Sequence, residues 1–498
     1  MSTTIKKAPS ALELYFEPFR KNIVGIDQTF ESPYGMQNLV YADWTASGRM
    51  YHPLEEKVLN EFGPFVANTH TETSTSGASM TLAYHEARNI IKRHVNASSD
   101  DVLITEGSGM TGVVNKFQRI LGLKICENLR PHANIPEDKR PIVFVSHMEH
   151  HSNQTSWLET IARVEVIPCD EYGLICLKSF KKLLEKYKDK PLKIASVTAC
   201  SNVTGIKTNY HKIAGLVHEY NGLCFVDFAC SAPYVDIDMH PEKEDEYLDA
   251  VFFSPHKFLG GPGSSGVLIF NKRLYKNTIP DNPGGGTVTY TNPWGEHDYF
   301  DDVETREDGG TPAFLQTIRV ALSIQLKEQM GTQNIKARED EVNEVIFETL
   351  ENLEGVKILA PRHKNRLSIF SFYYEKYHFN LVVKLLNDRF GIQTRGGCSC
   401  AGTYGHFLLN VDQETSHKIF DQILEGCNTE KPGWVRMSVH PTITDEEVAY
   451  ICESLKMLTE NIESWSKDYE YDAMKNDYVH KNWTPTERGL VAKWYNNL

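Results

Sequence analysis

The chain has 498 residues, of which 41% are hydrophobic, so it can bury a large core and form more than one lobe. Its net charge of -14 excludes the basic stripe that an extended nucleic-acid surface requires, and nucleic acid is therefore not an expected partner. Ten cysteines in so long a chain do not make a disulfide framework.

The N-terminal stretch indicates the cellular compartment. It has no apolar run of signal-peptide length, and it carries Glu13 and Glu17, acidic residues that mitochondrial presequences usually avoid. No run in the chain approaches the roughly 18 uninterrupted apolar residues that a membrane span needs. We therefore expect a soluble, cytoplasmic protein without membrane contact.

Short β-rich runs alternate with helical periods in the first two thirds of the chain. The candidate strands are DDVLITEG, RPIVFVSH, KIASVTACSN, GLCFVDFAC and DAVFFS, and a helix in HKIAGLVHEY separates the third from the fourth. This alternation predicts an α/β fold with a mainly parallel, doubly wound sheet.

The pattern changes after about residue 335 and predicts a smaller α+β lobe. A helix in KAREDEVNEVIFETLENL is followed by NRLSIFSFYY, NLVVKLLNDRF and TDEEVAYICESLKML, where Thr444 and Glu447 have capping-box spacing. The aromatic residues after position 463 predict an ordered tail that packs on the body or on another subunit. The predicted divisions are an N-terminal segment of the small domain (1–45), a large cofactor-binding domain (46–334), a small domain (335–462) and an aromatic extension (463–498).

Each candidate strand ends at residues whose polar groups can bind a ligand or react. Ligands of open α/β sheets bind beyond the carboxyl ends of the strands. The first strand runs into a Gly-rich turn that opens a helix, where the backbone N–H groups of Ser108, Gly109 and Met110 can hold an anion. The second ends at His150 and His151, a pair that by itself is more typical of a polar loop. Further metal ligands are missing around this pair, so no metal site is expected.

The remaining three strands end in an amide, a carboxylate and an amine. The third ends at Asn202, and the fourth at Asp227, which is costly to bury without a cationic partner and is otherwise a helix cap or a solvated turn. The fifth strand is followed by Ser254, His256 and Lys257. Considered alone, the position of Lys257 is more typical of a surface turn.

Together these five endings meet the needs of pyridoxal 5'-phosphate. Lys257 would form the Schiff base, made nucleophilic by desolvation, and Asp227 would pair with the protonated pyridine nitrogen. His150 would lie on the ring face, and Asn202 would bond the phenolic oxygen. The phosphate would take the helix N-terminus together with the side chains of Ser254 and His256.

The order of motifs over residues 38 to 460 resembles the class V aminotransferase group of fold type I pyridoxal-phosphate enzymes, and within it the cysteine desulfurases and selenocysteine lyases. The similar segments are YADWTASG, MEHHSNQTSW, SNVTG, VDFAC, SPHKFLGGPGSSG, GGGTV and DGGTPAF. The resemblance implies the fold type I architecture and a homodimer. Because GGGTV in relatives reaches the phosphate of the neighbouring subunit, it also implies that Thr287 contacts the cofactor across the dimer.

The smaller lobe contains GIQTRGGCSCAGTYGH, which is similar to the desulfurase loop R-x-G-x-x-C and to the desulfurase domain of molybdenum-cofactor sulfurases. The resemblance implies that Cys400 carries the thiol that attacks the substrate sulfur. Arg395 gives this loop the electropositive setting that lowers a thiol pKa, and it is a candidate substrate-binding residue. The segment WVRMSVHPT resembles the strand whose arginine binds the substrate carboxylate, which implies this role for Arg436.

Alternatives remain for the two cysteines of this loop. Cys398 and Cys400 could be half of a zinc site, although only His406 lies nearby in sequence, or they could be inert. Cys398 could instead resolve a persulfide.

Two departures from the family bear on the substrate and on the electronics of the cofactor: Cys230 replaces a glutamine that bonds the cofactor's phenolic oxygen, and Trp44 would narrow the entrance to the site.

The sequence thus predicts an enzyme that converts L-cysteine, or a related amino acid, to L-alanine and leaves a persulfide on Cys400. Lys257 and His150 are the other candidate catalytic residues, and a sulfur-acceptor protein is an expected partner. The alternative is a class V aminotransferase, epimerase or β-lyase in which Cys400 has no catalytic role, because one fold hosts several chemistries. A cofactor-free scaffold is a third interpretation.

Overall fold

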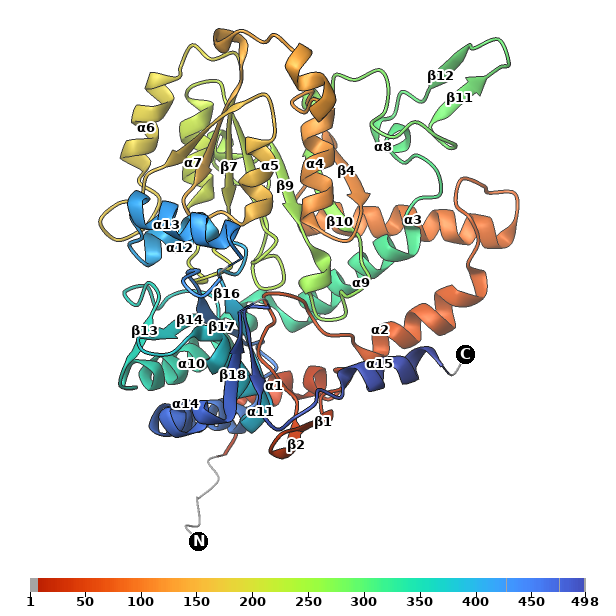
Figure 1. Cartoon of the computed structure of the whole chain (residues 1–498). Helices are drawn as coiled ribbons and strands as arrows, with labels where there is room; N and C mark the ends of the chain where they lie inside the picture. Colours follow the sequence, from red (N-terminus) through yellow and green to blue (C-terminus); the bar gives the residue numbers. More distant parts are fainter. Residues whose placement is uncertain (1–7, 427, 474, 497–498) are drawn as a thin grey trace. The chain divides into compact units, whose positions relative to one another are not determined.

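The computed structural model describes residues 8–426, 428–473 and 475–496, and its elements are labelled in Figure 1. Two compact units divide the chain. The larger unit contains residues 22–24 and 45–336, and the smaller unit contains the described residues of 1–21, 25–44 and 337–498. No described helix combines the length and the apolar character that a membrane crossing requires.

A seven-stranded sheet forms the centre of the larger unit (Figure 1). In sheet order its strands are β4 (Asp101–Glu106), β10 (Gly266–Asn271), β9 (Ala250–Phe253), β8 (Leu223–Asp227), β7 (Lys193–Thr198), β5 (Ile142–Ser146) and β6 (Arg163–Ile167). All run in one direction except β10, which is antiparallel to both of its neighbours. The mainly parallel sheet and its five predicted strands are confirmed, whereas the edge strand β6 was not predicted.

Helices cover both faces of this sheet, because successive apolar side chains of each strand point to opposite sides. Phe225 of β8 packs with helices α4 (Met110–Ile120) and α5 (Thr155–Leu158), and the adjacent Val226 packs with the helices of the other face. Those helices are α3 (Thr75–His94), α6 (Leu177–Lys186), α7 (Tyr210–His218) and α9 (Phe314–Met330). The sheet is therefore doubly wound, as the alternating sequence pattern predicts.

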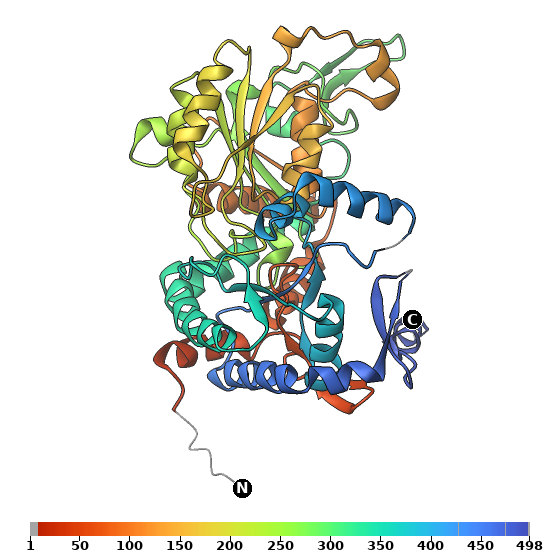
Figure 2. The same cartoon turned by 60° about the vertical axis from the view of Figure 1, so that its left-hand side comes forward.

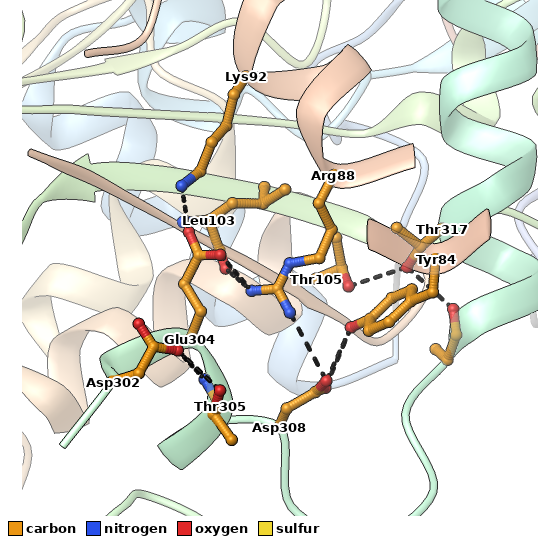
Figure 3. Close-up of polar contacts among 11 residues, drawn as sticks. Tyr84, Arg88, Lys92, Leu103, Thr105, Asp302, Glu304, Thr305, Asp308 and Thr317 are labelled. Carbon is orange, nitrogen blue, oxygen red and sulfur yellow. Dashed lines mark hydrogen bonds and ion pairs between the residues drawn. The ribbon is translucent and has the colours of Figure 1, made fainter. Parts of the chain in front are cut away.

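A polar cluster joins helix α3 to the short helix α8 (Val303–Arg306) inside the larger unit (Figure 3). The guanidinium of Arg88 lies 2.9 Å from the Glu304 carboxylate and 3.7 Å from the Asp308 carboxylate. It also donates a hydrogen bond to the carbonyl of Leu103 at 3.0 Å, and the Tyr84 hydroxyl donates to Asp308 at 3.0 Å. Burial raises the pKa of Asp308, and the charge of Arg88 acts against that shift. The cluster fixes the segment that leads into Gly309 and Gly310.

Replacing Arg88 with leucine is expected to lower the free energy of unfolding by about 3 to 5 kcal/mol, because it removes the buried guanidinium that pairs with Asp308 and leaves Glu304 with Lys92 as its remaining cationic partner. Chemical denaturation followed by circular dichroism measures this loss. The matched control is Arg93→Leu on the same helix. The Arg93 side chain is 65% exposed, against 9% for Arg88, and its ion pair with Glu86 is expected to contribute less than about 1 kcal/mol. Equal effects of the two substitutions would contradict a stabilising role for the cluster.

The smaller unit is built on a four-stranded antiparallel sheet. Its order is β13 (Val356–Ile358), β14 (Ile369–Tyr374), β17 (Trp434–Ser438) and β16 (Arg395–Gly397). The helices that share its core are α10 (Thr332–Glu351), α11 (Phe379–Phe390) and α14 (Asp445–Trp465). The capping box at the start of α14 is confirmed: the Glu447 N–H donates to the Thr444 hydroxyl, and the Thr444 N–H donates to the Glu447 carboxylate.

The C-terminal residues follow α14 as a hairpin of β18 (Tyr469–Asp472) and β19 (Asp477–His480), drawn in dark blue in Figure 2. The hairpin packs on the smaller unit: the Tyr469 hydroxyl donates to Asp388 of α11, and the ring of His480 lies edge-on against Tyr34 at a centroid distance of 5.5 Å. The last helix, α15 (Glu487–Tyr495), instead leaves Trp494 and Tyr495 exposed.

The remaining elements are shorter or peripheral. They are α1 (Ala11–Arg20), β1 (Thr29–Ser32), β2 (Gly35–Asn38), β3 (Val40–Tyr41), α2 (His52–Lys57), β11 (Val288–Thr291), β12 (His297–Tyr299), β15 (Ile392–Gln393), α12 (Gly402–Leu408) and α13 (Gln413–Leu424). Strand β3 pairs in parallel with β15 and so joins the N-terminal residues to the smaller unit.

Candidate functional site

Five parallel strands of the larger unit end at one edge of its sheet, and the predicted site residues follow them. Strands β4 and β9 are both antiparallel to β10, and β5, β7, β8 and β9 form parallel ladders, so all five point to the same edge. The residues at these ends are Ser108 and Gly109 after β4, His150 after β5, Asn202 after β7, Asp227 in β8, and Ser254, His256 and Lys257 after β9.

The start of α4 lies against the residues that follow β9. The Met110 N–H donates a hydrogen bond to the Ser254 hydroxyl at 2.9 Å. A Cβ at Gly109 would lie 3.2 Å from the Ser254 hydroxyl oxygen, which would have to shift by a few tenths of an ångström, and at an ordinary contact distance of 3.7 Å from the His256 ring. Burial, aided by the nearby charge of Lys257, lowers the pKa of His256 to about 4 and keeps its ring neutral near pH 7.

Asp227 is the buried acid of this edge, with 3% of its surface exposed. Burial raises its pKa to about 6, while the N–H of Ala229, 2.8 Å from Oδ1, and the positive charge of Lys257 act against the increase. Lys257 closes a short helical turn, Pro255–Lys257, through its own N–H and the carbonyl of Ser254. A lysine and a buried carboxylate that influence each other electrostatically form the chemical centre of this edge.

His150 is oriented by its neighbours. Its Nδ1 accepts the N–H of Ser152 at 3.1 Å, so the neutral ring carries its proton on Nε2. The Ser152 hydroxyl in turn lies 2.6 Å from that of Thr111, in the first turn of α4. These contacts connect the loop after β5 to the first turn of α4.

Asn202 and Cys230 are both buried beside the ends of β7 and β8. The thiol of Cys230 lies 3.8 Å from the carbonyl oxygen of Ser201, a weak hydrogen bond within the loop that carries Asn202.

Glu149 was not predicted, although it holds two strand ends together. One of its carboxylate oxygens accepts the N–H groups of Ser146 and Thr198, and the other accepts the side-chain amide of Asn153 at 2.7 Å. Burial raises the pKa of Glu149 to about 8. The sequence signal was a glutamate next to His150, directly after a buried apolar strand.

Thr287 does not share these contacts. Its side chain is buried, and its hydroxyl donates to the carbonyl of Gly284 at 2.6 Å and accepts the N–H of the same residue. The hydroxyl thus closes the Gly-rich turn of its own chain, and its contact with a cofactor across a dimer stays a prediction.

Cys400 lies in the smaller unit and is the exposed residue of a partly buried turn with an unusual backbone. The Ala401 N–H donates to the carbonyl of Cys398 at 3.0 Å, and the two central residues, Ser399 and Cys400, have φ angles of 51° and 57°. Positive φ at both central positions is the feature of a type I′ turn, which usually selects asparagine or glycine. Non-glycine residues in this region are uncommon and cluster at functional sites.

Arg395 and Arg436 lie opposite each other on β16 and β17 of the smaller unit. One carboxylate joins them: Asp43 Oδ2 accepts the Nε–H of Arg395 at 3.0 Å, and Asp43 Oδ1 accepts a guanidinium N–H of Arg436 at 2.8 Å. The Arg436 side chain is 4% exposed and that of Arg395 is 50% exposed. Asp43 was not among the predicted site residues, although its carboxylate in the segment YADWTASG was a visible signal.

Trp44 packs within the smaller unit. Its ring stacks on His440 at a centroid distance of 4.3 Å, and its indole N–H donates to the carbonyl of Tyr41. Burial lowers the pKa of His440 to about 3, so the stacked imidazole is neutral. With 5% of its surface exposed, Trp44 is fixed in the interior of the smaller unit by Tyr41 and His440.

Comparison of the sequence with known proteins identifies the family of this chain. Residues 40–451 match the model of the family described as aminotransferase class-V. A probable cysteine desulfurase from Staphylococcus epidermidis is 28% identical over 370 residues, which cover 73% of this chain and 84% of that protein. Another probable cysteine desulfurase, from Staphylococcus aureus, is 27% identical over the same shares.

Solved structures share the fold. The apo structure of a cysteine desulfurase from Thermococcus onnurineus superimposes with a TM-score of 0.71 at 22% identity, covering 89% of this chain and 98% of that one. A cysteine desulfurase from Escherichia coli in its S-sulfonic acid form gives a TM-score of 0.68 at 20% identity, with the same coverage. The predicted fold and family are confirmed. Since the family model spans most of the sequence, the chain belongs to the aminotransferase class-V family.

Proposed function

We propose that this protein is a pyridoxal-phosphate-dependent cysteine desulfurase that converts L-cysteine to L-alanine and holds the sulfur as a persulfide on Cys400. The observation that carries this proposal is the exposed Cys400 thiol on a turn with two positive φ angles, in a chain that also has Lys257 beside the buried Asp227. The names of its relatives support the same substrate.

The residues at the edge of the large sheet fit pyridoxal phosphate. A buried carboxylate such as Asp227 requires a cation, and a pyridinium nitrogen supplies one. The absence of a side chain at Gly109 leaves room beside the Ser254 hydroxyl and the neutral His256 ring, where a phosphate would meet the N-terminus of α4. Lys257 would hold the aldehyde carbon, and His150 and Asn202 would contact the ring.

Bound pyridoxal phosphate supplies an electron-withdrawing ring that stabilises negative charge on the substrate α-carbon. The side chains of the protein do the rest. Lys257 Nζ would take the α-proton, and Asp227 would keep the pyridine nitrogen protonated. The Arg436 guanidinium would bind the substrate carboxylate, since planar paired donors match its geometry.

Cys400 would complete the reaction by nucleophilic attack. The bond between its Sγ and the substrate sulfur forms while the bond between that sulfur and the substrate Cβ breaks, and the electron pair stays on the carbon. Cβ then receives a proton from His150 Nε2, which carries one, or from Lys257, and the proton lost by the Cys400 thiol replaces it. The α-proton that Lys257 took returns to Cα. L-cysteine and the Cys400 thiol thereby give L-alanine and the Cys400 persulfide, and all atoms balance.

Three finer parts belong to the same proposal. Selenocysteine would serve as a second substrate, because selenium can follow the same bond changes. The exposed position of Cys400 suits transfer of its sulfur to an acceptor protein. A second copy of the chain would complete the cofactor site through the Gly-rich turn at Thr287.

The deciding experiment incubates the purified holoenzyme with L-cysteine in the absence of oxygen. We expect equal amounts of L-alanine and released or bound sulfur, and a Cys400 peptide heavier by one sulfur atom in mass spectrometry. Formation of a keto acid from amino donors without sulfur release would instead support an aminotransferase. A protein that binds no pyridoxal phosphate, and so shows no yellow absorbance, would contradict both.

A further inference from the structure

We propose that Asp43 makes the enzyme select its substrates by charge. Together with Arg395 and Arg436 it forms a cluster with a single net positive charge, which favours amino acids that carry one carboxylate. This inference rests on the proposed function, because it takes Arg436 as the residue that binds the substrate carboxylate. Asp43 acts through the two arginines and is therefore a positioning residue.

The cluster needs a carboxylate for a structural reason. Arg395 and Arg436 are directly opposite each other on neighbouring antiparallel strands, and like charges in that position repel. Arg436 is also buried, and a buried cation without a partner is costly. Asp43 accepts one hydrogen bond from each guanidinium and offsets both effects.

Asp43 is held in place by its backbone. It forms a parallel bridge with Ser438 at the end of β17, and the N–H of Ser438 donates to the carbonyl of Ala42 at 2.8 Å. The N–H of Trp44 in turn donates to the carbonyl of Ser438. The carboxylate is thus fixed beside the strand that carries Arg436, and it orients that guanidinium without an entropic cost at substrate binding.

The charges of the three side chains define what they can bind. Two guanidinium groups and one carboxylate sum to one positive charge, which the α-carboxylate of a substrate neutralises. A second anionic group on the substrate would then find no uncompensated charge in this cluster, and it would meet Asp43 at close range. Such exclusion by a repulsive group is a common source of specificity.

The test compares the binding of two amino acids to the holoenzyme and to its Asp43→Asn variant. L-alanine carries one carboxylate and L-aspartate carries two; their dissociation constants are measured from the change in visible absorbance on titration. The variant cluster has two net positive charges. We expect the ratio of the L-aspartate to the L-alanine dissociation constant to fall by about tenfold. An unchanged ratio would overturn the inference.

Two further variants make the result specific. Asp468→Asn is the matched control, because Asp468 pairs with Arg389 at 3.0 Å in the same unit but contacts neither cluster arginine; the ratio should not change. Arg395→Gln removes the half-exposed cation and leaves no net charge in the cluster. It should weaken L-alanine binding by about tenfold without impairing folding, which keeps the inference testable if Asp43→Asn does not fold. Unaltered L-alanine binding by Arg395→Gln would overturn it as well.

Failure of this inference and failure of the proposed function have different signatures. An unchanged binding ratio, with normal L-alanine formation from L-cysteine by the native enzyme, would reject the role of Asp43 alone. A shifted ratio, with no L-alanine from L-cysteine, would reject the desulfurase reaction and leave the charge selection in place. KM for L-cysteine in the Asp43→Asn variant provides the second readout: a change in KM with nearly constant kcat indicates altered binding.

Discussion

The Lys257→Ala variant is expected to form L-alanine from L-cysteine about 10⁴-fold more slowly than the native enzyme, because it lacks the amine that moves the α-proton. Lys257 is also the amine that would bond covalently to the aldehyde of the cofactor, so the variant should lose the yellow absorbance of the linked cofactor. Its folding should be retained, since the short helical turn after β9 is closed by the backbone N–H of Lys257, which alanine keeps. Initial rates, visible spectra and thermal unfolding together measure these three effects.

Lys272→Ala provides the control for this prediction. Lys272 follows β10 in the same unit and pairs with Asp100 at 2.5 Å, and its side chain is 57% exposed. We expect full activity for the control. The substitution Lys257→Arg should not restore activity, because a guanidinium retains the charge but cannot act as the amine. Full turnover by Lys257→Ala would reject the assignment of the whole site.

The Cys400→Ser variant is expected to lose L-alanine formation by on the order of 10³-fold, as is usual for removal of a nucleophile. The hydroxyl preserves the size of the side chain and the turn, but it cannot take a sulfur atom from the substrate. The yellow absorbance should remain, because Cys400 belongs to the smaller unit and the sheet-edge residues belong to the larger one. Mass spectrometry of the peptide that contains this position should show no added sulfur.

Two cysteine variants separate this effect from general thiol loss. Cys398→Ser changes the other cysteine of the same turn, and Cys126→Ser changes an exposed cysteine of the larger unit. Both should keep L-alanine formation. If Cys398→Ser abolishes activity and Cys400→Ser does not, the attacking thiol is Cys398. If both retain it, the class V aminotransferase or β-lyase interpretation is the better one.

The sequence determined the fold of the larger unit and the chemistry at its edge. Runs such as LCFVD specify a buried strand by their own composition, and each polar residue directly after such a run must lie at the strand's carboxyl end. Asp227 and Lys257 could therefore be assigned to one edge before any tertiary contact was known. The capping box at Thr444 was predictable for the same reason, since both partners lie within one turn of helix.

The tertiary structure alone decided the contacts between distant segments. Asp43 meets Arg395 and Arg436 across 352 and 393 residues, and no local pattern specifies such a pairing. The edge strand β6 alternates charged and apolar residues and lacks the apolar run by which its neighbours were found. The left-handed turn at Ser399 and Cys400 could not be predicted, because neither residue prefers positive φ; the surrounding structure imposes that conformation on them. Local composition thus determined which reactive side chains the chain offers. Long-range packing decided that Asp43 lies between the two arginines and reduces the net charge of their cluster.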